Sequence, residues 1–409
     1  MNEIFDVAVV GAGPAGSSCA LTLAQMGLKN LVLIDQEIFP RDKACGDGIG
    51  PGAVQLMRKL GIQSSLRDHV PIKYLSVSGP HGTRATGVLP PVAGSVPVGY
   101  TIPRSIFDNY IFDAAIKAGA VNQSGHQVQQ VEWIGDQWKI DLKESAGGQQ
   151  RTIYTKVLVG ADGARSKVRR ALGIPFNSDR HTGTAARIYA EAKNSEFEAL
   201  QIDLKRSLLP AYGWLFPISK TKANIGVGID LDNYKKNSRH LEKLLSSYRQ
   251  ELGSSIEFDE QSYKAYILPY GSELPRLAHP QKSAAIIGDA GSMINPLTGE
   301  GIFYAMWAGE LLGRLLAETQ TKNDKLVSAK YALESFERQF REKFKSHYDI
   351  NWRMKKKVEN PIWCDMVIKA CKKDSKVLSN LIDLMMGDKK NLDPSMSMRI
   401  FARNFLPFF

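Results

Sequence analysis

Three glycine-rich regions, far apart along the chain, constrain what this sequence can fold into more than any other feature. They are residues 11–16 (GAGPAG), residues 161–163 (ADG), and the late pair 288–290 (GDA) and 299–301 (GEG). One such region alone is weak evidence, since glycine-rich turns are common. Together they predict a ligand long enough to touch the protein at three distant points, and FAD is such a molecule.

The first segment lies in the sequence context of a dinucleotide-binding turn. It follows the apolar run 5–10 and precedes a helical pattern over residues 17–26. Glycines there permit a tight turn and let backbone N–H groups approach a pyrophosphate, which the positive end of the helix favours. Asp35 ends a second apolar strand and can accept hydrogen bonds from ribose hydroxyls. The alternative is a glycine-rich turn without a ligand.

Length and composition favour a globular protein of two joined domains. The 409 residues are too many for one simple core, and the sequence has no long apolar span. The N-terminus leads directly into the first strand, so we expect no signal peptide. Four cysteines without metal-ligand spacing predict neither a metal site nor a disulfide framework, and a reducing cytoplasm fits best.

The chain is basic, with 53 Lys and Arg against 42 Asp and Glu. Basic and aromatic residues are not interleaved in a nucleic-acid-binding motif, so we expect no nucleic-acid partner. Residues 398–409 combine Arg399 and Arg403 with apolar and aromatic side chains. This C-terminus can contact an anionic membrane surface, which gives a peripheral membrane location, or it can pack on its own domain.

The order of expected elements indicates an α/β fold: a Rossmann-like FAD-binding domain, an inserted antiparallel β-sheet substrate domain and a helical C-terminal tail. The FAD-binding domain is discontinuous and takes residues 1–75, 100–183 and 280–325. The substrate-binding β domain takes residues 76–99 and 184–279, where alternating strand patterns predominate. Residues 326–409 form the helical C-terminal region.

The loop around Cys45 is the most specific feature after the first glycine segment. Glycines between residues 46 and 52 let the backbone approach a flat ring closely. Arg41 and Lys43 add positive charge beside the expected phosphates. A partly exposed thiol near basic groups has a lowered pKa, which makes Cys45 the candidate catalytic residue. The alternative is a small apolar residue that fills space.

Two charged residues and one helix start complete the expected cofactor contacts. Arg104 opens a predicted helix, where it can contact phosphate or ribose, or pair with a surface carboxylate. Asp289 follows a buried strand, where sugar hydroxyls can satisfy it. The backbone N–H groups of Gly301 and Ile302 begin a long helix and can stabilise negative charge on the pyrimidine side of a reduced flavin. A solvated helix start is the alternative.

An aromatic hairpin is the candidate substrate wall. Strand alternation places Tyr212, Trp214 and Phe216 on one face, and Gly226 and Gly228 follow in the next strand. Such a face is ordinarily core, but opposite a flavin it forms a wall for an apolar small molecule or lipid. The sequence holds one dinucleotide fingerprint. The external reductant, NAD(P)H or a reduced electron-carrier protein, must therefore reach the flavin transiently.

Over residues 4–320 the sequence resembles the geranylgeranyl reductase family, among the flavoproteins with a p-hydroxybenzoate-hydroxylase-like fold. The glycine segments are shared with aromatic hydroxylases and halogenases, whereas residues 40–46 (PRDKACG) and the hairpin at 212–228 look like the reductase branch. The resemblance implies that Cys45 lies near the reacting face of the flavin, that Val128 acts through its backbone, and that the hairpin lines an isoprenoid cavity. The FAD contacts that it implies are Gly13, Ala15, Asp35, Cys45, Gly46, Gly48, Arg104, Val128, Asp162, Asp289, Gly301 and Ile302.

These features lead to three hypotheses. The preferred one is an FAD-dependent oxidoreductase that reduces carbon–carbon double bonds of a prenyl (geranylgeranyl-type) or similar apolar substrate by hydride transfer from reduced flavin. The second is an FAD-dependent monooxygenase (hydroxylase) or halogenase-like enzyme acting on an aromatic or carrier-bound substrate. Tyr212 and Phe216 stand where halogenases of this group carry Trp and Ile, which argues against halogenation. The third is a membrane-surface lipid-binding flavoprotein without turnover.

Overall fold

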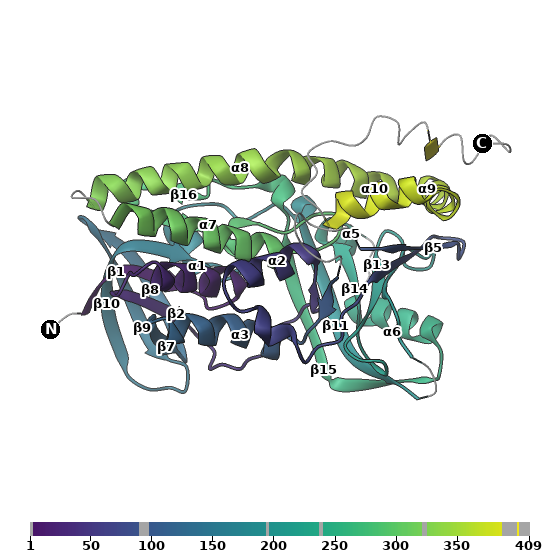
Figure 1. Cartoon of the computed structure of the whole chain (residues 1–409), viewed down its shortest axis with the longest axis horizontal. Helices are drawn as coiled ribbons and strands as arrows, with labels where there is room; N and C mark the ends of the chain where they lie inside the picture. The colour runs from purple at the N-terminus through teal and green to yellow at the C-terminus, as the bar shows by residue number, and fades with distance from the viewer. Residues whose placement is uncertain are drawn as a thin grey trace.

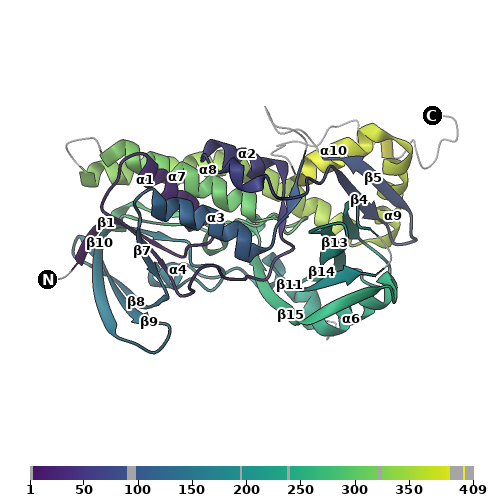
Figure 2. The same ribbon diagram turned by 60° about the horizontal axis from the view of Figure 1, so that its bottom comes forward.

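The computed structural model describes residues 3–89, 98–193, 196–236, 240–320, 325–386 and 399–400. Two large β-sheets lie side by side, and long helices run along one side of both (Figures 1 and 2). The expected α/β fold, with a Rossmann-type cofactor sheet, a second sheet and a helical C-terminal region, is confirmed.

The first sheet is the cofactor sheet, and its central strands are short apolar runs that are buried on both faces. Its strands are β1 (Glu3–Val10), β2 (Leu31–Asp35), β7 (Val121–Ser124), β8 (His126–Ile134), β9 (Gln137–Glu144), β10 (Gln150–Gly160), β16 (Ala278–His279) and β17 (Ala284–Ile286). The order is β16-β17-β10-β1-β2-β7, with β9 beside β10 and β8 beside β9. From β17 to β7 the pairs are parallel, which places the loops after β1, β10 and β17 at one edge.

Helix α1 (Pro14–Gln25) packs against both α3 (Arg104–Lys117) and α7 (Ile302–Gln320). The α1–α7 contact is close because glycines lie in it: a Cβ on Gly309 would be 2.2 Å from the Ala15 carbonyl oxygen, and one on Gly313 2.7 Å from that of Cys19. Helix α8 (Lys325–Val358) lies along α7 (Figure 1). Helices α2 (Pro51–Lys59) and α4 (Lys167–Ala171) complete this half.

The second sheet carries the predicted substrate wall. Its strands are β4 (Tyr74–Ser78), β5 (Arg84–Val88), β11 (Thr182–Ala192), β12 (Leu200–Asp203), β13 (Tyr212–Pro217), β14 (Lys222–Asp230) and β15 (Ile256–Pro269), in the order β15-β11-β14-β13-β12-β4-β5. Neighbours are antiparallel except for β12 and β4, which run parallel. No hairpin joins those two strands, because they come from separate segments of the chain. Helices α5 (Leu231–Lys236) and α6 (Leu241–Leu252) flank this sheet.

The C-terminal helices α9 (Pro361–Lys373) and α10 (Ser375–Met386) close over the second sheet (Figure 1, yellow). Gly87 of β5 permits the close approach of α10, since a Cβ there would lie 2.8 Å from Leu378 and 2.9 Å from Ile382. These helices and β4 and β5 share one apolar core. The tail is therefore part of the wall around the second sheet.

Short elements connect the larger ones. A two-stranded pair, β3 (Gly48–Ile49) and β6 (Tyr100–Thr101), fixes the loop after Cys45. Single 3₁₀ turns span Gln63–Leu66, Asp179–His181, Gly271–Glu273, Pro280–Lys282 and Gly288–Gly291. Of the predicted membrane-contacting segment 398–409, all but 399 and 400 lie outside the described residues. None of the helices that the structure describes is long and apolar enough to cross a bilayer.

Candidate active site

The turn between β1 and α1 presents backbone donors at the edge of the cofactor sheet. Gly13 precedes α1, and among the described residues no side chain caps the helix and no acidic residue lies in its first turn. The first N–H groups and the helix dipole are thus open to an anion. Gly11 has a φ of +100°, and a Cβ there would lie 2.2 Å from the Ala161 carbonyl oxygen. Glycine permits this packing, and the donors fit the pyrophosphate of FAD.

Asp35 and Arg41 flank this turn. One oxygen of Asp35 accepts a hydrogen bond from the Ala12 N–H at 2.7 Å, and the other accepts one from a second backbone N–H at 2.9 Å. Arg41 pairs with the buried Asp108 at 2.6 Å, and its Nη2 would lie 3.6 Å from a Cβ on Gly13. Arg41 therefore places a guanidinium beside the turn, and Asp108 fixes its position.

Three other predicted FAD contacts also lie in this half of the molecule. Ala15 is buried where α1 meets α7. Asp162 accepts hydrogen bonds from the Ser166 hydroxyl at 2.5 Å and from the Lys167 backbone N–H at 2.7 Å, so its carboxylate holds the start of α4. The Val128 carbonyl accepts a hydrogen bond from the Lys167 ammonium. Their contacts with FAD stay a prediction.

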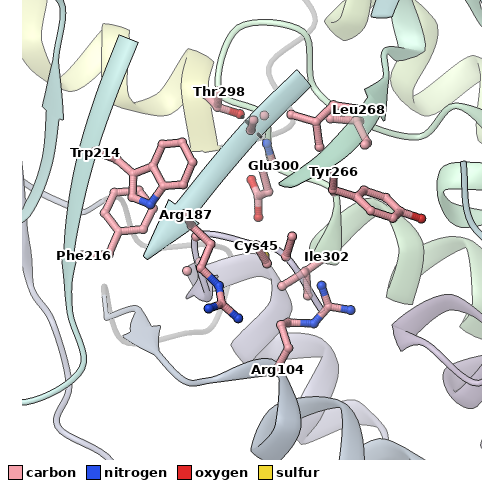
Figure 3. Close-up of a pocket in the computed structure, with 18 of the residues that line it drawn as sticks. Cys45, Arg104, Arg187, Trp214, Phe216, Tyr266, Leu268, Thr298, Glu300 and Ile302 are labelled. Atoms are coloured by element: carbon pink, nitrogen blue, oxygen red, sulfur yellow. Dashed lines mark hydrogen bonds between the residues drawn. The ribbon is translucent and has the colours of Figure 1, made fainter. Parts of the chain in front are cut away.

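A cavity joins this region to the second sheet. Its lining comes from Pro14 at the start of α1, from the loop 43–50, from the loop 298–302, and from strands β11, β13 and β15. The structure thus brings distant segments of the chain to one place (Figure 3). The predicted site residues that line the cavity are Cys45, Gly46, Gly48, Arg104, Tyr212, Trp214, Phe216, Asp289, Gly301 and Ile302.

Cys45 lies in this cavity beside Arg104, but its thiol is not activated. Burial raises the pKa of Cys45, and the nearby Arg104 guanidinium only partly opposes that effect. The expectation of a lowered thiol pKa is therefore wrong, because burial outweighs the positive charge. Arg104 is itself buried and donates to both oxygens of Asp108, at 2.6 and 2.7 Å. It is thus held inside the protein and does not form a surface ion pair.

A salt bridge joins the Cys45 loop to the end of the cofactor sheet. Lys43 donates to Asp289 at 2.8 Å, and its ammonium also lies 4.5 Å from the centre of the Tyr266 ring. One oxygen of Asp289 is thus satisfied within the chain, and the sequence did not reveal this partner. The contact of Asp289 with a sugar hydroxyl stays a prediction.

A buried hydrogen-bond network supports the aromatic wall from behind. Asn224 accepts a hydrogen bond from the Trp214 indole at 2.9 Å and donates to the Cys45 carbonyl and to Asp47, each at 2.8 Å. Asp47 also accepts a hydrogen bond from Tyr189 at 2.8 Å, and burial raises the pKa of Asp47 to about 6. Sequence reasoning missed this network, although an asparagine within the apolar strand 223–229 was an available signal.

A cation–carboxylate cluster lies at the β11–β15 side of the cavity. Arg187, buried in β11, donates to Asp42 at 2.5 Å, and Lys264 pairs with the same carboxylate at 3.0 Å. These residues tie the Cys45 loop to the second sheet. They too were missed, and the available signal was an arginine within the predicted β domain at residues 184–279.

The spacing of the hairpin glycines has a steric cause. Tyr212 pairs with Gly228 and Trp214 with Gly226 across β13 and β14. A Cβ on Gly226 would lie 2.1 Å from the Trp214 ring, and one on Gly228 would lie 2.8 Å from the Tyr212 ring. Both rings therefore lie flat over the neighbouring strand, which shapes the wall of the cavity.

Glu300 is a cavity residue whose role the sequence did not reveal. It lies between the glycines of the 299–301 segment and points into the cavity (Figure 3). Burial raises the pKa of Glu300 to about 8. Its carboxyl group is thus mostly protonated at neutral pH. A carboxyl residue between two glycines that precede a helix was the available signal.

A second cavity lies beside the first, beneath the C-terminal helices. It lies between β12 and helices α8, α9 and α10, and apolar side chains such as Leu204, Val367 and Leu381 line it. The residues that line both cavities are Ile202, Tyr212, Thr298 and Met385. These side chains therefore lie between the two spaces.

Comparison with known proteins agrees with this geometry. The FAD binding domain family model matches residues 5–334. The menaquinone reductase of Mycolicibacterium smegmatis is 34% identical over 326 residues, which cover 77% of each chain. The digeranylgeranylglycerophospholipid reductase of Methanocella arvoryzae is 30% identical over 361 residues, which cover 88% of each chain.

The chain belongs to the geranylgeranyl reductase family of FAD-dependent oxidoreductases. A geranylgeranyl bacteriochlorophyll reductase-like protein from Thermoplasma acidophilum has a solved structure with a TM-score of 0.82, 19% identity, and coverage of 99% of this chain and 97% of that one. The flavin-dependent brominase Bmp2 gives a TM-score of 0.71 at 19% identity, over 98% of each chain. The fold is therefore common to reductases and halogenases, so the chemistry must be argued from the cavity.

Proposed function

We propose that this FAD-dependent oxidoreductase reduces carbon–carbon double bonds in the isoprenoid chain of a lipid or quinone. The observation that carries this proposal is the pair of neighbouring cavities, which share four lining residues. The first adjoins the expected flavin site and is walled by Tyr212, Trp214 and Phe216, and the second lies beside it and is lined mostly by apolar side chains. A long apolar chain fits this shape better than a compact polar ring does.

FAD fits the residues around the first cavity. The N–H groups after Gly13 would hold the pyrophosphate, and Asp35 and Asp289 would accept hydrogen bonds from sugar hydroxyls. The backbone N–H groups of Gly301 and Ile302 would face the pyrimidine part of the ring at the start of α7. When bound and reduced, FAD supplies a hydride to the substrate.

The chain's own residues would orient the substrate and exclude water. An isolated alkene accepts a hydride poorly, so a dry and tightly shaped cavity must contribute much of the rate. The Trp214 indole is fixed by Asn224 at 2.9 Å, which keeps the aromatic wall in one position. Helices α9 and α10 would cover the distal part of the isoprenoid chain.

The similar proteins support this substrate class. The names of two relatives specify menaquinone and a digeranylgeranyl glycerophospholipid, and both compounds carry isoprenoid chains. The reductant that recharges the flavin is proposed to be external, either NAD(P)H or a reduced carrier protein. Because the substrate is a membrane lipid, peripheral contact with a membrane is part of the proposal, and liposome flotation with and without residues 398–409 tests it.

An anaerobic single-turnover experiment tests the function. Dithionite-reduced enzyme is mixed with a geranylgeranyl lipid, which carries no quinone ring that could itself oxidise the flavin, and the fully saturated analogue serves as the control. We expect the oxidised flavin spectrum to return with the unsaturated compound alone, and mass spectrometry to find two added hydrogens per reduced bond. If prenyl compounds do not reoxidise the reduced enzyme in the absence of oxygen, and the enzyme inserts oxygen into a substrate in air, then the protein is a monooxygenase instead.

A further inference from the structure

Two carboxyl groups line the first cavity, and they differ in their surroundings. Asp289 pairs with Lys43 at 2.8 Å. For the Glu300 carboxyl, no hydrogen bond or ion pair is found within the part of the chain that the structure describes. Figure 3 shows it in the middle of the cavity, between the Trp214 side and the Tyr266 side. A carboxyl group in such surroundings is costly to ionise and keeps its proton.

The loop that carries Glu300 is held rigidly. The buried Asn295 side chain accepts hydrogen bonds from the Leu297 N–H at 2.9 Å and the Thr298 N–H at 3.3 Å. The Asn295 N–H donates to the Glu300 carbonyl at 2.8 Å, and the Glu300 N–H donates to the Thr298 hydroxyl at 3.2 Å. These bonds fix the backbone of Glu300, so its side chain projects from a defined point. Gly301, which follows directly, is an expected flavin contact.

We propose that Glu300 donates the proton that completes reduction of the substrate double bond, an inference that rests on the function proposed above. One alkene carbon gains the hydride that the reduced flavin supplies. The O–H bond of Glu300 breaks, and a C–H bond forms at the other alkene carbon. The π bond is thereby replaced by two C–H bonds, the flavin loses two electrons, and Glu300 is left as a carboxylate that water reprotonates.

Cys45 is the competing donor, and acidity decides between them. The pKa of Glu300 is about 8, whereas burial raises the pKa of Cys45 above its ordinary value of 9.0. An alkene carbon is a weak base, so the stronger acid in its protonated form is the better donor. The other charged or titratable groups that line the cavity are Lys43, Arg104, Arg187, Tyr212, Lys264, Tyr266 and Asp289, and Tyr348 of α8 lies near Glu300.

The primary test is E300Q in the anaerobic single-turnover assay. We expect E300Q to bind FAD and to be reduced by dithionite normally, and its reoxidation by the prenyl substrate to slow by about 100-fold or more. E318Q is the matched control, because Glu318 lies in α7 in a half-exposed pair with Arg314; it should react as wild type does. C45S should lose less rate than E300Q. Reoxidation of E300Q within about 3-fold of wild type would overturn the proton-donor role.

A second readout does not depend on turnover. Infrared difference spectra of FAD-free protein should show a protonated carboxyl band that titrates near pH 8 in wild type and is absent in E300Q. If the band is unchanged in E300Q, the protonated carboxyl belongs to another residue and the inference fails. If this test succeeds but wild-type enzyme does not reduce prenyl compounds, the proposed function is what has failed.

Chemical rescue separates proton donation from positioning. E300A leaves a space beside the substrate, and added acetic acid should restore its rate in proportion to the protonated acid. Acetamide, which has the same number of heavy atoms but no acidic O–H, should not restore it. Equal rescue by both compounds would show that Glu300 acts by filling space, which would overturn the proposal.

Discussion

The two sides of the cofactor cavity are built by different means. On the cofactor-sheet side, glycine turns and helix starts present backbone N–H groups, and side chains such as Asp35 are satisfied locally. On the second-sheet side, aromatic rings form the wall, and a buried network centred on Asn224 joins strands and loops distant in sequence. The first side fits a fixed anionic cofactor. Under the proposed function, the second side is where differences in side chains would change the substrate.

The largest effect is expected on the cofactor-sheet side, at Gly11. In G11A the new Cβ would meet the Ala161 carbonyl at 2.2 Å in a backbone of positive φ. We expect a loss of about 3 kcal/mol or more in the free energy of unfolding and little bound flavin. Gly27 is the matched control, since its φ is +95° but no atom lies within 4 Å of its ideal Cβ.

Thermal unfolding and the flavin content of purified protein measure both variants. G27A should lose only about 1 kcal/mol, from backbone strain alone, and keep its flavin. If G11A and G27A lose equal amounts of stability and flavin, then the close contact between Gly11 and the loop after β10 does not fix the cofactor-binding turn in place.

The next effect is expected on the second-sheet side, at Trp214. In W214A the KM for a long prenyl substrate should rise by about 30-fold, which is about 2 kcal/mol of lost contact and support. The Kd for FAD should change by less than about 3-fold. The control is W133A, because Trp133 lies in β8 against Trp138 with ring centres 5.4 Å apart, away from the cavity lining.

Steady-state kinetics and flavin titration separate these two outcomes. If W214A loses flavin and substrate affinity together, then the aromatic face is structural core, and the two sides of the cavity are less independent than their construction indicates.

The features of the cofactor-sheet side depend on residues that lie close together in the sequence, and these were the features that the sequence predicted best. The β1–α1 turn, the strand that ends at Asp35 and the start of α7 follow from patterns within about 30 residues, and these were predicted closely. The sequence also indicated the importance of Gly226 and Gly228 in the strand after the aromatic segment. In the structure these glycines lie opposite Trp214 and Tyr212 on the adjacent strand.

Contacts between distant segments could not be predicted in this way. The pKa of Cys45 was expected to fall, but it rises because covering protein outweighs the charge of Arg104. The partner of Lys43 is Asp289, 246 residues away, and Asn224 bonds to the Cys45 carbonyl across 179 residues. Glu300 lies in the glycine-rich segment 299–301, for which the sequence predicted only backbone contacts of Gly301 and Ile302. Its raised pKa depends on burial, which only the folded chain provides.

A smaller effect is expected in the pH dependence of stability. It tests Glu300, which lies between the two sides of the cavity. The pKa of Glu300 rises from 4.5 to about 8 on folding, so between those values the folded chain holds a proton that the unfolded chain has lost. The stability of wild type should therefore fall as pH rises through that window, and E300Q should not show this loss.

The expected change in the free energy of unfolding is modest, because water that enters the cavity screens the Glu300 carboxylate. The free energy of unfolding of E300Q relative to wild type should increase by about 1–2 kcal/mol between pH 5 and pH 8, less than the full shift would give. Urea unfolding at the two pH values measures it. A difference that is flat with pH would show that Glu300 ionises normally in the folded protein.

The smallest effect is expected at Met385, which lines both cavities. A substitution there tests whether the substrate-binding space of the second side reaches into the second cavity. In M385W the larger ring should narrow the junction under α10. The KM for substrates of four or more isoprene units should rise about 5-fold, or about 1 kcal/mol, and that for one-unit substrates should not change. The chain-length series is its own control, since a general loss of folding would affect all lengths alike. Equal KM changes at every length would place the distal chain outside the second cavity, and helices α9 and α10 would then have no part in substrate selection.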